Sequence, residues 1–353
     1  MFVTDNGSNM KAAYRNDVRI SCAGHNLNLA VEKAIKSVGQ HPVTDAIKCA
    51  KEVVAYFKHS GANKELDQTL KQDVSTRWNS QFFLLQSLAS QLNDVKAVLG
   101  ANKQYEKLEL LNGVDERLFN DLVNFLHPFH TATVQLSRDK IPTAPDVWPM
   151  LHRLQSLCKI TEHDSDSMRE IKSAFRASVD EKYLIHPMHK LATLVCPSFK
   201  HLTFVNSDER EEVYTQLRCK IDSLPSFASE DSEFSDSAQE PSTKKIKVDE
   251  EADLLSEYKT ALVSPNVTDT RHELEQYLSL PVTDTTALRF WQEQSNGGKF
   301  PKLTRIATQL LAIPATSTAS ERVFSVCGNI LTERRCRMQP ETLEKLLFLK
   351  YNM

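Results

Sequence analysis

The chain has 353 residues, of which 41% are hydrophobic and 25% charged, so it can bury a core of ordinary size in one elaborated domain or two. A net charge of −3 excludes the global basic field that many nucleic-acid binders carry, although the region from Lys299 to Lys350 is locally basic. No apolar run approaches the roughly 18 residues that span a bilayer, and seven scattered cysteines without a Cys-x-x-Cys pair indicate reduced thiols of the cytosol or nucleus.

The N-terminal residues 1–4 are apolar and β-prone, and they predict a short strand. Asp5, Asn6 and Gly7 interrupt it, and Ser8 is placed to cap a helix that runs through Tyr14. An aspartate at the tip of a buried strand is a common position for a catalytic carboxylate. An Asx-turn explains it equally well, so the pattern leaves both interpretations open.

Residues 18–22 predict a second strand, which leads into a helix from His25 to Ile35. Cys22 and His25 are spaced so that they could bind zinc, but a structural zinc site needs four ligands and no nearby pair supplies the others. A buried thiol and a hydrogen-bonded or DNA-facing histidine are favoured. A second His/Cys group is better explained as solvated surface; it comprises His186, His189, Cys196 and His201.

Residues 42–59 have one apolar stripe and predict a helix. Trp78 then heads a long amphipathic helix that carries Phe82, Leu85 and Leu88, so it can simply anchor the packing of that helix. Residues 84–225 are helix-patterned almost throughout and predict an all-α block.

An acidic, serine-rich segment at 227–257 has almost no apolar residues and predicts a disordered loop. The short basic cluster inside it, at 241–248, contains Lys244, Lys245 and Lys247 and is compatible with a nuclear import signal.

Near the C-terminus, Pro314 ends a helix of residues 302–313, and Thr316 or Ser317 caps the next one. Glu321 falls in the first turn of that helix, where either a reactive carboxylate or one favoured by the helix dipole fits. A basic turn at 332–337 could contact phosphate or be a solvated face. Pro340 begins a terminal helix so apolar that it must pack on the core or on a second subunit.

The run ATSTASERVFSVCGNILTERRCRMQPETLEKLLFLKYN, residues 315–352, resembles the C-terminal signature of the hAT superfamily of DNA transposases, from which BED-type zinc-finger proteins descend. Three further blocks are similar to hAT motifs. They are VTDNGSNM around Asp5, the Cys-x-x-His of residues 22–25, and the Arg-Trp pair at 77–78.

The resemblance implies a ribonuclease-H-like fold with an Asp-Asp-Glu metal site, an inserted helical domain and a C-terminal dimerisation region. The expected fold class is therefore α/β with a large all-α insertion, mostly helical, around a partial ribonuclease-H-like core that lacks its first strands. The expected domains are residues 1–59 for the core, 60–290 for the insertion, and 291–353 for the dimerisation region that completes the core.

By the same resemblance, Asp5 and Glu321 are the second and third catalytic, metal-binding carboxylates, which would hold Mg²⁺ if the site is active. The implied DNA-facing residues are His25, Arg77, Trp78, Arg322, Arg334 and Arg335. The implied dimerisation residues are Phe324, Leu343, Leu346 and Leu347. The first aspartate of the motif would lie upstream of this chain, so the site is expected to be incomplete.

Two hypotheses follow. The first is a non-catalytic, transposase-derived nuclear protein that binds DNA and forms homodimers, without a membrane or small-molecule partner. The second is an active Mg²⁺-dependent hAT transposase represented by an N-terminally truncated chain.

Overall fold

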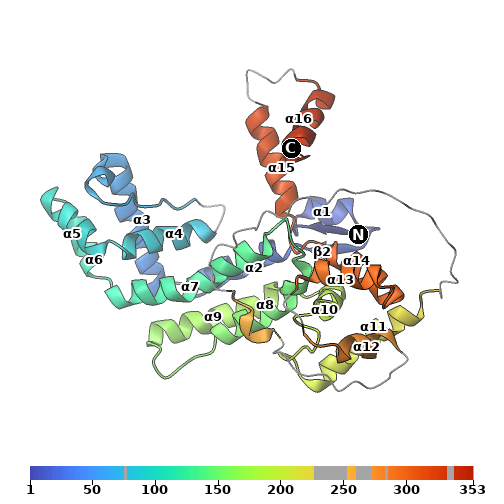
Figure 1. Cartoon of the computed structure of the whole chain (residues 1–353). Coiled ribbons are helices and arrows are strands. Elements are labelled where there is room, and N and C mark those ends of the chain that lie inside the picture. The colour runs from blue at the N-terminus through green and yellow to red at the C-terminus, as the bar shows by residue number, and fades with distance from the viewer. Residues whose placement is uncertain (75–77, 226–252, 260–271, 283–284, 332–337, 353) are drawn as a thin grey trace. The chain divides into compact units, whose positions relative to one another are not determined.

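A computed structural model describes residues 1–74, 78–225, 253–259, 272–282, 285–331 and 338–352. The predicted loop at 227–257, the import signal and Arg77, Arg334 and Arg335 lie wholly or mostly outside these residues. The described residues form two compact units, one made of 1–186 and 313–353 and the other of 187–312 (Figure 1). This division rests on contacts within the chain, and the predicted domain boundaries stay a prediction.

The first unit is mainly helical. Its elements are β1 (Phe2–Thr4), α1 (Ser8–Ala13), β2 (Arg19–Ser21), α2 (Ala23–Ser37), α3 (Pro42–Ser60), η1 (Ala62–Glu65), α4 (Trp78–Ala89), α5 (Leu92–Ala101), α6 (Tyr105–Asn112), α7 (Glu116–Leu136), α8 (Ala144–Leu157), α9 (Asp166–Lys182), α15 (Thr318–Ile330) and α16 (Pro340–Asn352).

The two strands form a parallel pair in which Val3 lies opposite Ile20. The described residues are thus mostly helical with a two-stranded sheet, and a ribonuclease-H-like core stays an expectation. Both strands were predicted. The predicted capping role of Ser8 was wrong, because Gly7 occupies the N-cap position of α1 and Ser8 is its first helical residue, without a side-chain cap.

The core of this unit lies where α2 packs on α9 and α7 packs on α4 and α8. Phe125 and Phe129 of α7 each meet Phe175 of α9 edge to face, with ring centroids 5.0 Å apart. Such aromatic contacts hold the helices together because each ring buries a large apolar area in a defined geometry. The helices of this unit are therefore held in place by closely packed side chains.

The second unit contains α10 (Pro187–Leu194), α11 (Ser207–Asp222), η2 (Ser256–Tyr258), α12 (Glu273–Ser279), α13 (Ala287–Asn296) and α14 (Pro301–Leu311). Tyr277 and Trp291 are buried at its centre with ring centroids 5.1 Å apart. Their polar atoms donate hydrogen bonds to the carbonyl oxygens of Leu194 and Val195. The chain from 84 to 225 is helical as predicted, although α4 to α9 belong to the first unit and α10 and α11 to the second.

None of the helices in the described ranges has the length and apolarity that crossing a bilayer requires.

Candidate functional site

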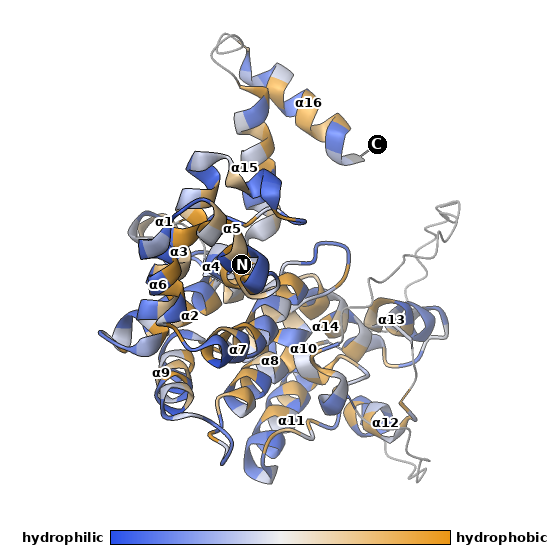
Figure 2. Cartoon of the chain, turned by 90° about the vertical axis from the view of Figure 1, so that its left-hand side faces the viewer, coloured by the Kyte–Doolittle hydropathy of each residue, from blue (hydrophilic) through white to orange (hydrophobic). Residues whose placement is uncertain are grey.

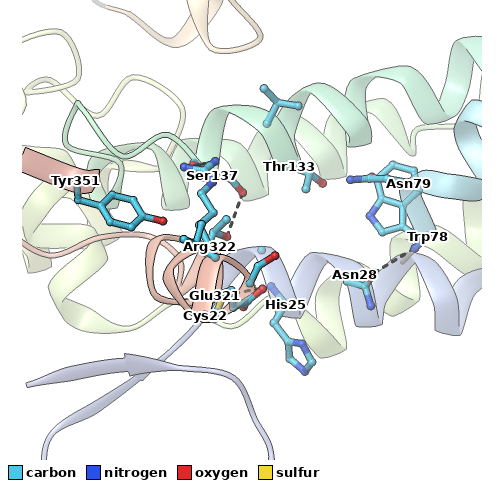
Figure 3. Close-up of a pocket in the computed structure, with 15 residues that line it drawn as sticks. Cys22, His25, Asn28, Trp78, Asn79, Thr133, Ser137, Glu321, Arg322 and Tyr351 are labelled. Atoms are coloured by element: carbon cyan, nitrogen blue, oxygen red, sulfur yellow. Dashed lines mark hydrogen bonds between the residues drawn. The ribbon is translucent and has the colours of Figure 1, made fainter. Parts of the chain in front are cut away.

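A pocket of about 740 Å³ lies in the first unit, where the starts of α2, α4 and α15 meet the C-terminal end of α7 (Figure 3). The 15 residues that line it are Cys22, Gly24, His25, Asn28, Trp78, Asn79, Thr133, Val134, Ser137, Thr318, Glu321, Arg322, Ser325, Val326 and Tyr351. Four predicted site residues, His25, Trp78, Glu321 and Arg322, are therefore brought together.

Cys22 links two of these helix starts. Its Sγ accepts a hydrogen bond from the backbone N–H of His25 in α2 and another from the N–H of Ser317, which precedes α15, each at 3.4 Å. The side chain is 2% exposed. Cys22 therefore caps a helix and joins two segments that lie far apart in sequence, which agrees with the predicted buried thiol.

Residues 315–317 are fixed to the same region through the backbone. The Ala315 carbonyl accepts from the N–H of Ala23, and the Ala315 N–H donates to Thr143 Oγ1, both at 2.9 Å. A side chain at Gly24 would place its Cβ 3.1 Å from Thr316 Cγ2, so glycine permits this close approach. The start of α15 is thus fixed by close contact with the start of α2.

Glu321 lies in the first turn of α15 and is exposed. Its Oε1 accepts a hydrogen bond of 3.0 Å from Ser317 Oγ. The carboxylate therefore sits where it stabilises the helix start, the position that the dipole interpretation required.

Arg322 is held against the end of α7. Its Nη1 pairs with Asp139 Oδ2 at 2.7 Å, and its Nη2 donates to the Ser137 carbonyl at 3.0 Å. The guanidinium lines the pocket while its charge is balanced by Asp139.

Trp78 is the first residue of α4, and its backbone N–H donates to Asn28 Oδ1 at 3.3 Å. The side chain is 3% exposed, and the DNA-facing role implied for Trp78 stays a prediction. Within the described part of the chain its Nε1 has no hydrogen-bond partner, and neither does Asn79 Oδ1. Figure 3 shows Trp78 and Tyr351 at opposite ends of the pocket.

Asp5 is not among the pocket residues. Its Oδ1 accepts from the N–H of Gly7 at 3.1 Å in an Asx-turn at the end of β1. The adjacent Asn6 donates to Asn26 Oδ1 of α2 at 2.7 Å, which fastens this turn to the core.

Over the described ranges, no group of three or more His, Cys, Asp or Glu side chains is arranged to hold an ion. Asp5 and Glu321 are each engaged locally, by Gly7 and Ser317. Their predicted catalytic role stays a prediction.

The predicted dimerisation residues fall into two sets. Leu343 and Leu347 line an apolar groove of about 430 Å³ between α15 and α16, together with Val323 and Phe348. Phe324 and Leu346 instead point to solvent, with 73% and 41% of their surface exposed.

Sequence reasoning missed the polar wall of the pocket, which consists of Asn28, Asn79, Thr133, Ser137 and Thr318. Thr133 and Ser137 belong to the end of α7, far from every motif in the sequence. Asn28 and Asn79 each lie close to a motif residue, His25 and Trp78, and that proximity was the available signal.

Two family comparisons cover separate parts of the chain. Residues 273–353 match the hAT family C-terminal dimerisation region, and residues 20–125 match the ZBED1 RNase-like helical domain.

Among the similar proteins is zinc finger protein 618 of Homo sapiens, 24% identical over 361 residues, which cover 100% of this chain and 36% of that protein. Zinc finger BED domain-containing protein 4 of Homo sapiens is 25% identical over 376 residues, or 99% of this chain and 31% of the relative. The transposable element Hobo transposase of Drosophila melanogaster is 23% identical over 203 residues, or 57% of this chain and 30% of the transposase. The chain thus spans about a third of the length of these relatives.

Proposed function

Since the chain carries the C-terminal region of hAT-superfamily transposases and is related to BED-type zinc-finger proteins, we propose that it is a transposase-derived nuclear protein that associates with itself and with DNA and does not cleave it. The observation that carries the proposal is the apolar C-terminal hairpin, meaning α15 and α16, which lies within the matched dimerisation region of residues 273–353.

The surface of this hairpin supports self-association. Phe348 is 65% exposed and Leu349 51%, while Phe324 of α15 is also open to solvent. Figure 2 shows hydrophobic stretches along both α15 and α16. Exposed apolar clusters of this kind mark interaction sites, because water is released when they are covered. A second copy of the chain presents the same surface and can cover it.

The pocket supports contact with DNA. Three helix starts meet there, and the N-terminal end of a helix favours negative charge through its dipole. Hydroxyl and amide side chains such as Thr133 and Asn79 line it, and these groups commonly contact phosphate and sugar. Glu321 is acidic and Arg322 is paired with Asp139, so the pocket has no strong positive charge. Any affinity of the pocket for DNA therefore comes from hydrogen bonds.

The arrangement of the carboxylates supports the proposal that the protein does not cleave DNA. An Asp-Asp-Glu site requires several carboxylates to hold two ions about 4 Å apart, whereas Asp5 forms its own turn away from the pocket lining. The alternative, an active transposase that uses Mg²⁺ with Asp5 and Glu321, would need a further carboxylate beside these two.

Self-association is tested by co-precipitation of two differently tagged copies. We expect the wild-type copies to capture one another and the Leu346→Asp variant to fail, because a carboxylate in an apolar interface is costly to bury. Lys345→Asp places the same charge on the neighbouring residue of α16 as a control. Equal capture by wild type and Leu346→Asp would contradict the proposed surface.

The absence of cleavage is tested by incubating the full chain with supercoiled DNA and Mg²⁺. We expect no nicked product, and no difference between wild type and Asp5→Ala. Mg²⁺-dependent nicking that Asp5→Ala abolishes would instead establish the active transposase.

A further inference from the structure

A second cavity in the first unit lies beside α4 (Figure 1), between this helix and the segment that follows η1. Its volume is about 560 Å³, within the roughly 300–1,000 Å³ of typical ligand sites. The residues that line it are Gln68, Thr69 and Lys71 of the segment and Phe83, Gln86, Ser87 and Ser90 of α4. It shares no lining residue with the pocket at the start of α15.

The segment is held beside α4 by side chains. Residues 69–74 belong to no helix or strand. The Lys71 N–H donates to Ser87 Oγ at 2.9 Å, which ties the segment directly to α4. The buried Gln91, which follows α4, donates from its Nε2 to the Gln68 carbonyl at 2.7 Å. Both walls of the cavity therefore keep their positions relative to each other.

Part of the backbone beside the cavity is open to a ligand. Among the residues that the structure describes, the N–H and the carbonyl of Thr69 have no hydrogen-bond partner, and neither has the carbonyl of Lys71. Unpaired backbone groups of this kind are where an extended peptide can add hydrogen bonds from its own backbone. On the opposite wall, Gln86 and Ser90 can both donate and accept, as a peptide backbone requires.

Two further side chains indicate what such a peptide carries. Phe83 is 40% exposed, and its ring meets His130 of α7 edge to face with centroids 4.8 Å apart. It therefore presents an aromatic surface on which another aromatic side chain can pack. Lys71 is exposed and is the one charged residue among those that line the cavity. No ion pair within the described ranges balances its charge, so a carboxylate is favoured beside it.

We infer that this cavity is a docking site for an extended peptide that carries an aromatic side chain between carboxylates. The peptide backbone pairs with Thr69, its aromatic ring packs on Phe83, and a carboxylate lies beside Lys71. A nucleic-acid strand suits this lining less well, because affinity for phosphates depends on several cationic groups and the lining has one. The inference goes beyond the proposed function, since it concerns another surface and another class of partner.

The test is fluorescence anisotropy with the full chain and the fluorescein-labelled peptide Gly-Glu-Phe-Glu-Gly. We expect wild type to bind this peptide saturably. Replacing the phenylalanine of the peptide by alanine should weaken binding by about 5-fold or more, because the aromatic contact with Phe83 is lost. This change is made in the peptide, so it leaves the fold of the protein untouched.

A matched pair of protein variants locates the site. Lys71→Glu should weaken binding of the acidic peptide by about 5-fold or more, because an attraction is replaced by a repulsion. Lys64 of η1 is also exposed but does not line the cavity, so Lys64→Glu should bind as wild type does. The peptide Gly-Lys-Phe-Lys-Gly should instead bind Lys71→Glu more tightly than wild type. Urea unfolding of both variants checks that they fold.

Three results would overturn the inference. The first is the absence of saturable binding by wild type up to millimolar peptide. The second is equal weakening by Lys71→Glu and Lys64→Glu, which would show attraction to the general charge of the protein. The third is displacement of the bound peptide by tetrathymidylate, which would assign the cavity to nucleic acid.

Discussion

At the residue scale, Lys200 is the most unusual charged group of the second unit. It is 1% exposed, and its Nζ donates to the carbonyl oxygens of Tyr277, at 3.1 Å, and of Leu280. Burial lowers the pKa of this amine from 10.5 to about 8. The ammonium group thus satisfies carbonyls at the end of α12 while it is removed from water.

This pKa shift predicts a pH dependence of stability. Between pH 8 and pH 10.5 the unfolded chain binds more protons at Lys200 than the folded chain, so the free energy of unfolding rises with pH across that window and is flat below it with respect to this group. We expect Lys200→Met to remove this pH dependence, so that its loss of stability relative to wild type is smaller at neutral pH, where wild type carries the cost of a buried charge, and larger by about 1–3 kcal/mol near pH 10, where the neutral amine still donates to the two carbonyls.

The measurement is chemical unfolding at pH 7 and pH 10 for wild type, Lys200→Met and the exposed-lysine control Lys299→Met. Other groups also titrate in this range, so the quantity to compare at the two pH values is the difference in free energy of unfolding between wild type and each variant. An unchanged difference between Lys200→Met and wild type at the two pH values would show that Lys200 keeps its ordinary pKa.

Some residue roles could be predicted from the sequence and others could not. The cysteine at position 22 was expected to be buried because no ligand set for zinc was present, and it is. The bond from Cys22 to Ser317 could not be foreseen, since nothing in a linear pattern relates residues so far apart. The covering of Trp78 likewise depends on how α4 packs, which periodicity alone does not report.

At the scale of elements, Glu273 stabilises the start of α14. Its carboxylate accepts from the backbone N–H groups of Lys302, at 3.3 Å, and Leu303, at 2.7 Å. These N–H groups have no partner within their own helix, and a negative charge there interacts well with the dipole.

We therefore expect Glu273→Ala to lower the free energy of unfolding by about 1 kcal/mol. Glu293→Ala is the control, because the Glu293 carboxylate forms an exposed pair with Arg289 of the same helix. Denaturant titration gives the free energy of unfolding of both variants. Decreases of equal size in Glu273→Ala and Glu293→Ala would contradict a capping role for Glu273.

The attachment of α15 makes a second prediction at this scale. Arg322→Ala should speed amide hydrogen exchange in residues 318–325, because the helix loses its bonds to Asp139 and to the Ser137 carbonyl. Both charged groups are half exposed, so the pair itself contributes no more than about 1 kcal/mol.

Asp139→Ala should reproduce part of this effect, and the double variant should exchange no faster than Arg322→Ala alone, since both changes remove the same pair. Fully additive increases would mean that the two residues act independently.

The elements themselves were largely predictable. The helix at 42–59 and the start of the terminal helix at Pro340 agree with the structure, because apolar periodicity and proline are local signals. The helix predicted to run on from Trp78 ends at Ala89, and α5 begins at Leu92. The apolar pattern continues from α4 into α5, so the pattern could not show that one helix ends and another begins there.

At the scale of the whole molecule, the least predictable features are the two units and the pocket. Periodicity shows which face of a helix is apolar but not which helix covers it, so α7 could not be placed beside α15. The apolar sequence of the terminal helix also predicted that this helix packs on the core or on a second subunit. In the structure α16 leaves Phe348 65% exposed and Leu349 51% exposed, which leaves a second subunit as the proposed partner.

Sedimentation equilibrium of the full chain, from nanomolar to tens of micromolar, tests this central claim most directly. We predict that wild type shifts from monomer to dimer with rising concentration, and that Leu346→Asp stays monomeric while Lys345→Asp behaves as wild type. A wild-type chain that remains monomeric throughout, or a Leu346→Asp dimer as tight as wild type, would contradict the account.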